Sequence, residues 1–550
     1  MGSIAQMAYL AAHGKDIPQN FCEATTGPDT DQWWKAMNEE IAMLQKHGTW
    51  NLVDRPKGCK VIGSRWTYAI KYGPDGEILC YKAWLVAQGY LQIPGVDYSD
   101  TFSPTVRLDS LWAILHFAAA HGWYRSQDDV TGAFLHSEID HEIFMKQPEG
   151  FSDGSDKVAE LLLSLYGIKQ GSHLWNKYMH QKLVTCNFAC LTSDHAVYTR
   201  RTAAGISITA IHVDNALTVA SSKKMLAETR QALHDLFEMK EEDPNWLMGF
   251  KLIDNHKKCT VSISQAQYID TVLKRFSMDK CNPVSTPMDP GLVLSKLDCP
   301  QTEAEKSKMA EYPYREVLGA ITWLAIVSQP DLAHASSQLG QYSTNPGKTH
   351  WKAVTRVLRY LKGTCDLTLT LGRVGDANPD VLTGHTDASW ADNVDDQWSM
   401  SGYVYQLGDA VILWNSKKQH TVTASSTEAK YMSLSHSAKQ ALWLRQFLCD
   451  AVIHLPSHPW WELNCLSTIP VWLHLQRRCA CMHAWSTSTC IITSCGNMSR
   501  TAPLRSCTYL PVKCSQTDSQ RHCRALDTRI WWNDSHWQRS EGVCWRTDTS

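Results

Sequence analysis

The stretch ISITAIHVDNALTVA, residues 206–220, decides the fold of this chain. Apolar and polar residues alternate on both sides of His212-Val213-Asp214-Asn215, which is typical of two β-strands joined by a tight turn. An acid at the tip of such a hairpin is poorly placed for packing and well placed to hold a metal ion. A two-metal phosphoryl-transfer site needs several carboxylates. This turn offers one carboxylate, from Asp214, and one amide, from Asn215.

Patterns of period 3.6 and period 2 extend outward from this hairpin. They predict helices at residues 31–45, 108–121, 174–185, 223–239, 265–276, 314–327, 350–362 and 426–448. They predict strands at residues 61–72, 77–88, 382–387, 402–407 and 411–414, with a further strand beginning at 126. The Pro-, Ser- and Asp-rich stretch 283–300 is the best linker candidate. We therefore expect a mixed α/β body followed by a smaller unit of three strands and a helix.

The bulk composition is that of an ordinary globular protein, with 43% hydrophobic and 20% charged residues in 550. The formal net charge of −2 does not indicate a protein that is basic overall. A local basic cleft would still be enough to bind nucleic acid. No apolar run reaches membrane-spanning length, and residues 1–20 lack the pattern of a signal peptide. We therefore expect a cytoplasmic or nuclear protein without a membrane partner.

Two pairs of acids suggest metal-assisted chemistry. Asp129 lies at a predicted strand end and pairs with Asp214 in the hairpin; Asp387 lies at another strand end and pairs with Glu428, early in a helix. An acid on a strand with an acid on a neighbouring element is how a metal-assisted phosphodiester site is usually built. For any one of the four, taken alone, a surface or capping role is favoured.

The order of motifs around these acids resembles the reverse transcriptase and RNase H part of a copia-type retrotransposon polyprotein, from about residue 31 to 455. The motifs are GVDYSDTFSPTVR (95–107), QDDVTGAFL (127–135), IFMKQPEGF (143–151), LYGIKQGSHLW (165–175), HVDN (212–215), SQAQYIDTVLKRFSM (264–278), YREVLGAITWL (314–324), HWKAVTRVLRYLKGT (350–364), SGYVY (401–405) and SSTEAKYMSLS (425–435).

The resemblance implies an α+β fold, a right-hand polymerase with fingers, palm and thumb, followed by an incomplete mixed α/β RNase H-like domain. The implied divisions are a disordered N-terminus at 1–30, fingers and palm with the start of the thumb at 31–280, a linker with thumb and connection helices at 281–380, the truncated RNase H-like domain at 381–455, and a disordered tail at 456–550.

The resemblance also implies a role for each site residue. Asp129 and Asp214 match the palm aspartates that hold two Mg²⁺ ions, for which Mn²⁺ is a substitute, and Asn215 stands beside them. Phe134 matches the aromatic gate under the incoming sugar, Gln170 a residue beside nucleotide and template, and Lys82 a lysine near the triphosphate; an exposed strand lysine is the simpler interpretation of Lys82. Asp387 and Glu428 match the first two metal-holding acids of the RNase H site. The implied partners are an RNA or DNA template with its primer, an RNA–DNA hybrid and dNTPs.

Several positions depart from the family pattern. The turn is normally Tyr-Val-Asp-Asp, so that Asn215 replaces a charged ligand in a site where electrostatics dominate. Other departures are Trp84, Trp112 and Trp398 for Arg, His173 for Arg, Lys430 for Glu, and Asp392 and Asp409 for Gly. Each needs only one C-to-T or G-to-A transition, which is the pattern expected of a decaying mobile element.

The last hundred residues differ from the rest of the chain. They hold nine of the 19 Cys and eight of the 23 Trp, and their hydrophobic periodicity is lost. A zinc site at Cys479, Cys481, His483 and Cys490 is one interpretation, but its irregular gaps lack the paired spacings of zinc modules. We favour a frameshift between about residues 455 and 472, which would also remove the later RNase H acids.

The sequence therefore predicts an RNA-directed DNA polymerase with an RNase H remnant, acting by two-metal nucleotidyl transfer with impaired activity. The alternatives are a remnant that binds nucleic acid without catalysis and a pseudogene product.

Overall fold

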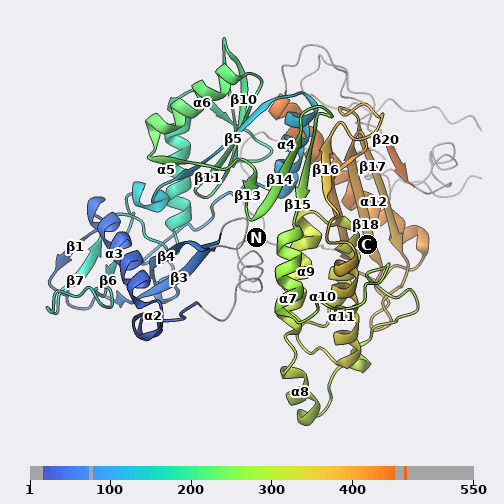
Figure 1. The fold of residues 1–550 in the computed structure, drawn as a ribbon, viewed down its shortest axis with the longest axis horizontal. Coiled ribbons are helices and arrows are strands. Elements are labelled where there is room, and N and C mark those ends of the chain that lie inside the picture. The colour runs from blue at the N-terminus through green and yellow to red at the C-terminus, as the bar shows by residue number, and fades with distance from the viewer. Residues whose placement is uncertain (1–16, 73–77, 453–463, 468–550) are drawn as a thin grey trace, which may run out of the picture. The chain divides into compact units, whose positions relative to one another are not determined.

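The chain is described from a computed structural model, which covers residues 17–72, 78–452 and 464–467. The helices labelled in Figure 1 are α2 Phe21–Thr26, α3 Thr30–Lys46, α4 Leu108–Ala120, α5 Gly171–Thr185, α6 Lys223–Leu236, α7 Ala266–Arg275, α8 Glu303–Ala310, α9 Tyr314–Val327, α10 Ala333–Gly340, α11 Lys348–Gly363 and α12 Ser426–Val452. None of these helices is long and apolar enough to cross a membrane.

A six-stranded antiparallel sheet holds the hairpin that opened the sequence. Its order is β12-β5-β11-β10-β9-β8, and its strands are Met239–Glu242, Tyr124–Val130, Asn215–Ala220, Gly205–His212, Val197–Thr202 and Phe188–Cys190. Leu217 and Val219 of β11 pack with α4, whereas Val130 of β5 packs with α5 and α6. Successive strand residues point to opposite faces of the sheet. Adjacent acids of β5 therefore face different helices.

Four smaller sheets complete the described strands. They are β1 Trp50–Val53, β7 Val158–Leu161, β6 Phe144–Met145 and β2 Val61–Ile62; β3 Ser64–Tyr72 with β4 Ile78–Ala87; β13 Trp246–Leu247, β14 Phe250–Asn255, β15 Thr260–Ser264 and β16 Leu369–Gly372; and β19 Ala410–Lys418, β18 Met400–Leu407, β17 Leu382–Ser389 and β20 Asn464–Ser467.

The predicted mixed α/β character is confirmed. All eight predicted helices form. Helix α4 is buried on nearly all sides, whereas α7, α9, α10 and α11 bury apolar faces against one another in one apolar cluster. The predicted strand from 126 begins at Tyr124 and ends at Val130, and residues 133–136 form a short 3₁₀ helix instead. The turn Pro74-Asp75-Gly76 lies outside the described residues.

Both predicted disordered ends need correction where the structure describes them. In the N-terminal stretch, residues 21–26 form α2, because the Asn20 side chain caps it by accepting from the backbone N–H of Glu23. In the C-terminal stretch, residues 464–467 form β20, which pairs in parallel with β17. Residues 1–16, 456–463 and 468–550, which include the candidate zinc ligands, lie outside the described residues.

Trp112, one of the departures from the family pattern, lies at the centre of an apolar cluster. Its side chain is 0% exposed, and its ring meets that of Phe250 edge-on with centroids 5.3 Å apart. Its indole N–H is buried without an acceptor among the residues that the structure describes. An unsatisfied buried donor costs about 1–3 kcal/mol, so the core tolerates this tryptophan at a cost in stability.

Candidate active site

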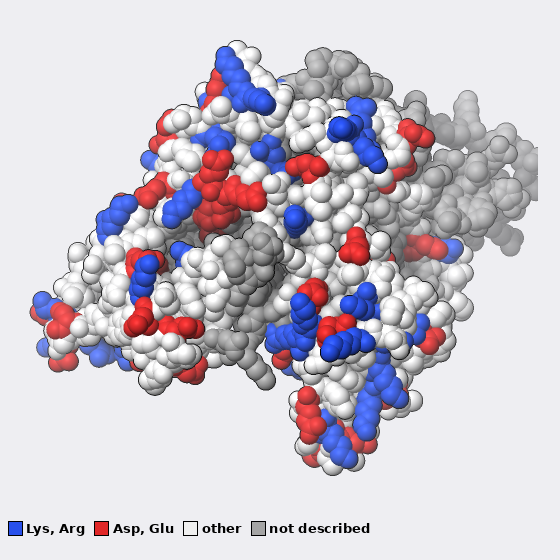
Figure 2. Space-filling view, in the orientation of Figure 1, with Lys and Arg blue, Asp and Glu red and all other residues white. Residues whose placement is uncertain are grey.

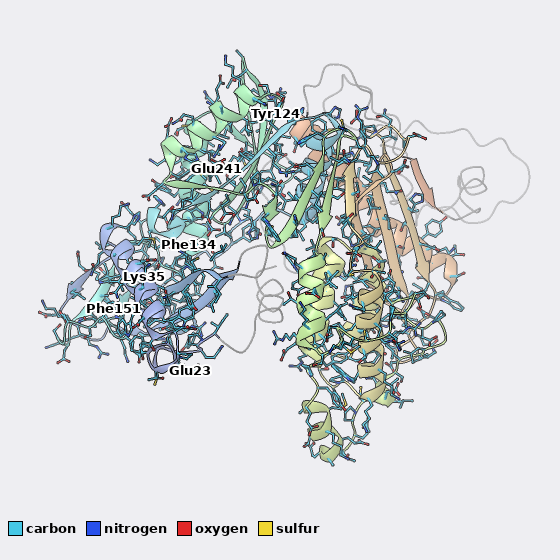
Figure 3. All side chains as sticks on the ribbon, in the orientation of Figure 1. Glu23, Lys35, Tyr124, Phe134, Phe151 and Glu241 are labelled. Carbon is cyan, nitrogen blue, oxygen red and sulfur yellow. The ribbon has the colours of Figure 1, made fainter. Side chains whose placement is uncertain are left out.

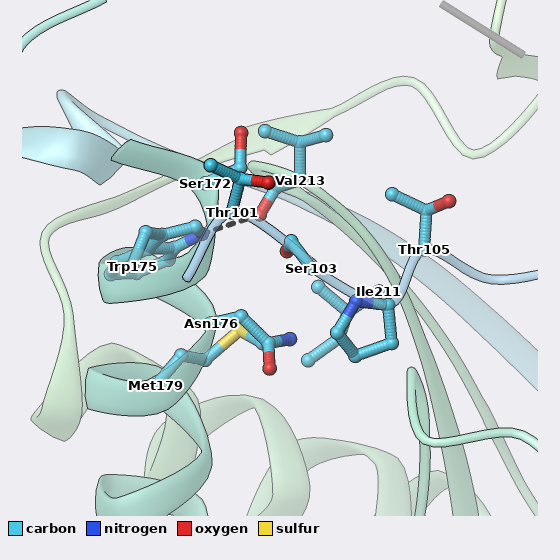
Figure 4. A pocket seen from close by; sticks show the side chains of 10 residues that line it. Thr101, Ser103, Thr105, Ser172, Trp175, Asn176, Met179, Ile211 and Val213 are labelled. Atoms are coloured by element: carbon cyan, nitrogen blue, oxygen red, sulfur yellow. Dashed lines mark hydrogen bonds between the residues drawn. The ribbon is translucent and has the colours of Figure 1, made fainter. Parts of the chain in front are cut away.

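The turn of the β10–β11 hairpin is strained. His212 is registered opposite Asn215, which leaves Val213 and Asp214 as a two-residue loop, and Val213 has a φ of 62°. A β-branched residue rarely adopts this left-handed conformation, and such strain persists only where the surroundings hold it. Here the indole N–H of Trp175, from α5, donates to the Val213 carbonyl at 2.7 Å, as the dashed line in Figure 4 shows.

The strand register brings the two predicted aspartates together. Asn215 on β11 is registered opposite Asp129 on β5, and the backbone N–H of Val130 donates to the Asp214 carbonyl at 2.9 Å. Asp129 and Asp214 are both half-buried. Residues separated by 85 positions in the chain therefore meet at one end of the central sheet.

The two adjacent acids of β5 serve different purposes. Asp128 is 0% exposed and faces α6, where Arg230 donates to it at 2.8 and 3.1 Å and the His234 ring lies 3.0 Å away. Asp129 points to the opposite face because side chains alternate along a strand. Asp128 is thus the anchor for α6, and Asp129 lies on the other face of β5, in register with Asn215 of the hairpin.

Tyr166 lies close to this acidic pair, and Phe134 packs against Tyr166. The ring of Phe134, labelled in Figure 3, is 9% exposed and meets that of Tyr166 edge-on at 4.8 Å. Burial raises the pKa of the Tyr166 phenol above its ordinary value, and the charges of Asp214, Glu40 and Asp129 raise it further. Tyr166 therefore stays protonated as a neutral neighbour of both aspartates.

Asn215 is held by hydrogen bonds on both sides of its amide. Its nitrogen donates to an Asp214 carboxylate oxygen at 3.2 Å, and its oxygen accepts from Gln127 at 3.3 Å. Gln127 in turn donates to Glu242 at 2.8 Å. The amide thus occupies one oxygen of Asp214 and contributes no negative charge of its own. Figure 2 shows further acidic side chains over β5, β11 and β12, where Figure 3 labels Glu241.

A cavity of about 240 Å³ lies beside the strained turn (Figure 4). The hairpin lines this cavity with Ile211 and Val213, and α5 lines it with Trp175 and Met179. The polar lining consists of Thr101, Ser103, Thr105, Ser172 and Asn176. These groups are uncharged donors and acceptors, in contrast with the carboxylates on the other side of the turn.

The structure buries Gln170 completely. Its amide accepts from Gln92 at 3.1 Å and donates to the Asp97 carbonyl at 2.9 Å and to Asp140 at 3.3 Å. These bonds tie the loop before α4 to the turn that begins α5. In this arrangement the side chain is a structural tie, and its predicted contact with nucleotide and template stays a prediction.

Glu40 is a residue that the sequence patterns did not single out. It lies on α3, its carboxyl is only 6% exposed, and it accepts from the backbone N–H of Leu85 at 3.3 Å. Burial raises its pKa to about 7, although that hydrogen bond and the charge of half-buried Lys82 on β4 act in the opposite direction. An acid at a position that the helical periodicity assigns to the core was the available signal.

Replacing Glu40 by glutamine is expected to change how stability depends on pH. Because the folded-state pKa lies above the ordinary value of 4.5, folding is favoured by the proton below pH 4.5 and loses that contribution as pH rises towards 7. The Glu40→Gln protein should therefore gain about 3 kcal/mol on the parent between pH 4.5 and 7.5. Urea midpoints at the two pH values measure this difference. The control is Glu39→Gln, at an exposed position of the same helix. If the stability of Glu40→Gln and of the parent changed with pH in parallel, the assignment would be contradicted.

At the second pair of acids, Asp387 and Glu428, the structure shows other partners for both side chains. From α12, the side chain that reaches Asp387 is Lys430, whose ammonium lies 3.3 Å from a carboxylate oxygen. The Glu428 carboxylate instead accepts from the backbone N–H of Ala424 at 2.6 Å, while its own N–H donates to the Ser425 hydroxyl. Residues two apart on a helix point in different directions, so Lys430 and Glu428 leave α12 on different sides, and the pairing of Glu428 with Asp387 stays a prediction.

The donor sets of the two sites differ in their fit to a divalent cation. Asp129 and Asp214 supply the carboxylate oxygens that Mg²⁺ prefers, whereas Asp387 is paired with an ammonium. No group of three or more His, Cys, Asp or Glu side chains suited to a metal occurs within residues 17–72 and 78–452. Only the first pair fits the expected ion.

The amino-acid sequence of this chain is similar to those of known proteins. Residues 47–290 match the family described as reverse transcriptase (RNA-dependent DNA polymerase). The retrovirus-related Pol polyprotein from transposon TNT 1-94 of Nicotiana tabacum is 36% identical over 441 residues, covering 80% of this chain and 33% of its own length. Those from transposons RE2 and RE1 of Arabidopsis thaliana are 36% and 34% identical over 438 residues, each covering 78% of this chain and 29% of their own length.

The chain spans about a third of the length of these relatives. With the reverse transcriptase match over residues 47–290 and four-fifths of the chain aligned, this chain corresponds to a fragment of a copia-type retrotransposon Pol polyprotein.

Proposed function

We propose that this protein is the RNA-directed DNA polymerase of a copia-type retrotransposon, with its nucleotidyl-transfer site at Asp129 and Asp214. The observation that carries the proposal is the β5–β11 register, in which Asp129 faces the residue that follows Asp214. Nucleotidyl transfer needs carboxylates on one face that can neutralise divalent cations. A DNA primer, an RNA or DNA template and dNTPs are the proposed substrates.

The residues around the acids suit the parts of a nucleotide. Asp129 and Asp214 would hold Mg²⁺, which when bound lowers the pKa of a primer 3′-hydroxyl and polarises the α-phosphate. The Phe134 ring, backed by Tyr166, would leave no room for a 2′-hydroxyl. The Lys82 ammonium would attract the triphosphate. The β13–β14 hairpin, in which Leu247 pairs with Phe250, would steady the primer end.

The domain names follow from the same proposal. Residues 31–280 would form fingers and palm with the start of the thumb, and α9 to α11 would form the thumb and connection. The unit of β17, β18, β19 and α12 would be a remnant of RNase H. Its substrate by descent would be the RNA strand of an RNA–DNA hybrid.

A second candidate function is binding of nucleic acid without catalysis. It is favoured by the Asn215 amide, which contributes no charge to the polymerase site, and by the Lys430 ammonium beside Asp387. Primer extension on an RNA template with Mg²⁺ and dNTPs distinguishes the two. Template-copied product supports the polymerase, whereas binding of the primed template without product supports the second function.

One face of α11 is a candidate contact for the nucleic-acid backbone. It carries five cations spaced by four, four, three and three residues, and the helix contains no acid: Lys348, Lys352, Arg356, Arg359 and Lys362. This spacing aligns them opposite the buried stripe, over about 21 Å at 1.5 Å per residue. None of the five forms an ion pair with a carboxylate in the part of the chain that the structure describes. Figure 2 shows basic side chains gathered around α7 and α11.

Reversing two charges on this basic face of α11 is expected to weaken binding of a primed template. Lys348 and Lys352 are exposed on the surface of α11. Each lost phosphate contact should reduce the slope of log affinity against log salt by about 0.9 on a duplex of B-form geometry. Fluorescence anisotropy of a labelled duplex across a salt series measures the slope for Lys348→Glu/Lys352→Glu. The same double reversal at exposed Lys35 and Lys57 is the control, and equal slopes for all three proteins would exclude this face.

A further inference from the structure

We propose that Lys430 is a tethered substitute for the divalent cation at Asp387, so that this second carboxylate site binds no divalent metal. The inference goes beyond the nucleotidyl-transfer proposal and stands on a different part of the fold. A failure of primer extension would leave it untouched.

The ion pair itself is the first observation. The Lys430 Nζ lies 3.3 Å from Asp387 Oδ1, and the two side chains are 30% and 58% exposed. A divalent ion at Asp387 would have to displace the ammonium and then remain close to its positive charge. Two like charges that lie this close together near a protein surface repel each other. The ammonium therefore opposes the ion while satisfying the carboxylate.

Within residues 17–72, 78–452 and 464–467, the elements next to Asp387 use their polar groups elsewhere. The Glu428 carboxylate caps the start of α12 through Ala424, and the Ser433 hydroxyl donates to the Asp387 carbonyl, which fixes the helix against β17. The parallel neighbour β20 has the sequence Asn464-Cys465-Leu466-Ser467, without an acid. A hard cation such as Mg²⁺ needs one or two carboxylates together with other oxygen ligands, and here a single carboxylate remains.

The helix geometry also identifies the position from which a carboxylate would complete the site. Since Lys430 reaches Asp387, a glutamate at 430 would project to the same place, whereas one at 428 would not. Without the ammonium, two carboxylates at this place would repel each other. A bound divalent cation would offset that repulsion. The chain thus differs from a metal-binding version at this site by one side chain.

The test counts bound Mn²⁺ by electron paramagnetic resonance in the full chain and in Lys430→Glu. We expect one additional Mn²⁺ per chain in Lys430→Glu, and its loss when Asp387→Asn is added. Lys439→Glu, the same change at an exposed lysine further along α12, should add none. Because an exposed ion pair contributes only about 0–1 kcal/mol, unchanged melting of Lys430→Gln checks that the fold survives.

Two results would overturn the proposal. One is a loss of bound Mn²⁺ from the otherwise unchanged chain on Asp387→Asn, since it would show that the site holds metal despite Lys430. The other is a Lys430→Glu protein that binds no more Mn²⁺ than the parent while melting at the same temperature.

Discussion

Replacing Asn215 by aspartate is expected to raise the rate of primer extension about 100-fold, the effect typical of one well-placed electrostatic group in an active site. In the parent, the Asn215 amide donates to Asp214 and adds no charge. An aspartate would add one negative charge beside two carboxylates and would leave Asp214 free to accept from other groups. The half-saturating Mg²⁺ concentration should fall together with the rise in rate.

The structure leaves room for this change. Aspartate has the same shape as asparagine, and Gln127 can donate to either, while its bond to Glu242 persists. Without a cation, the third carboxylate should lower the melting temperature through repulsion, and Mg²⁺ should restore it. Asn51→Asp, the same change at an exposed strand position, is the control. If Asn215→Asp left both the rate and the Mg²⁺ dependence unchanged, the assigned role of position 215 would be incorrect.

Changing Asp129 or the adjacent Asp128 to asparagine is expected to have different effects. The first change should lower activity, and the second should lower stability. Asp129→Asn should lower extension by about 10³-fold with little change in melting, because a half-buried acid at the site loses its charge. Asp128→Asn should cost about 2–3 kcal/mol of stability, because Arg230 and His234 lose a fully buried acceptor.

Thermal melting and extension rates of the two variants, both in the Asn215→Asp background, separate these effects. At a temperature where Asp128→Asn remains folded, it should retain most of the extension activity. The assignment would be reversed if Asp129→Asn were the unstable protein and Asp128→Asn the inactive one.

The hairpin and the long helices were predictable because their signals are local. Alternation around Asp214 and the turn at 212–215 predict β10 and β11, and the order of motifs led to Asp129 as the partner strand residue. The register that joins Asp129 to Asn215 is a long-range pairing, which depends on packing of α4 on one face and α5 and α6 on the other.

At the second site, the local sequence pattern indicated a capping role for Glu428. A glutamate three residues after a serine at a helix start is a capping box, and Ser425 with Glu428 fits that pattern. Position 430, two residues on, points in another direction and reaches Asp387. Helical periodicity therefore contained the information that Lys430 and Glu428 leave the helix in different directions.

Other features were beyond local patterns. Gln170 is buried by hydrogen bonds to Gln92, Asp97 and Asp140, residues 30 or more positions away. The raised pKa of Glu40 depends on the covering of α3 by β4. Such environments arise only when distant segments pack. The periodicity of α3 places Glu40 on the buried face, but its raised pKa and the hydrogen bonds of Gln170 depend on those distant contacts.

The most direct test of the account is single-nucleotide incorporation on a primed RNA template by the Asn215→Asp chain, with and without Asp129→Asn. The account predicts that Asn215→Asp incorporates the templated dNMP in the presence of Mg²⁺ and that adding Asp129→Asn removes at least about 10³-fold of that rate. Incorporation that persists undiminished after Asp129→Asn would contradict the assignment of the polymerase site to Asp129 and Asp214.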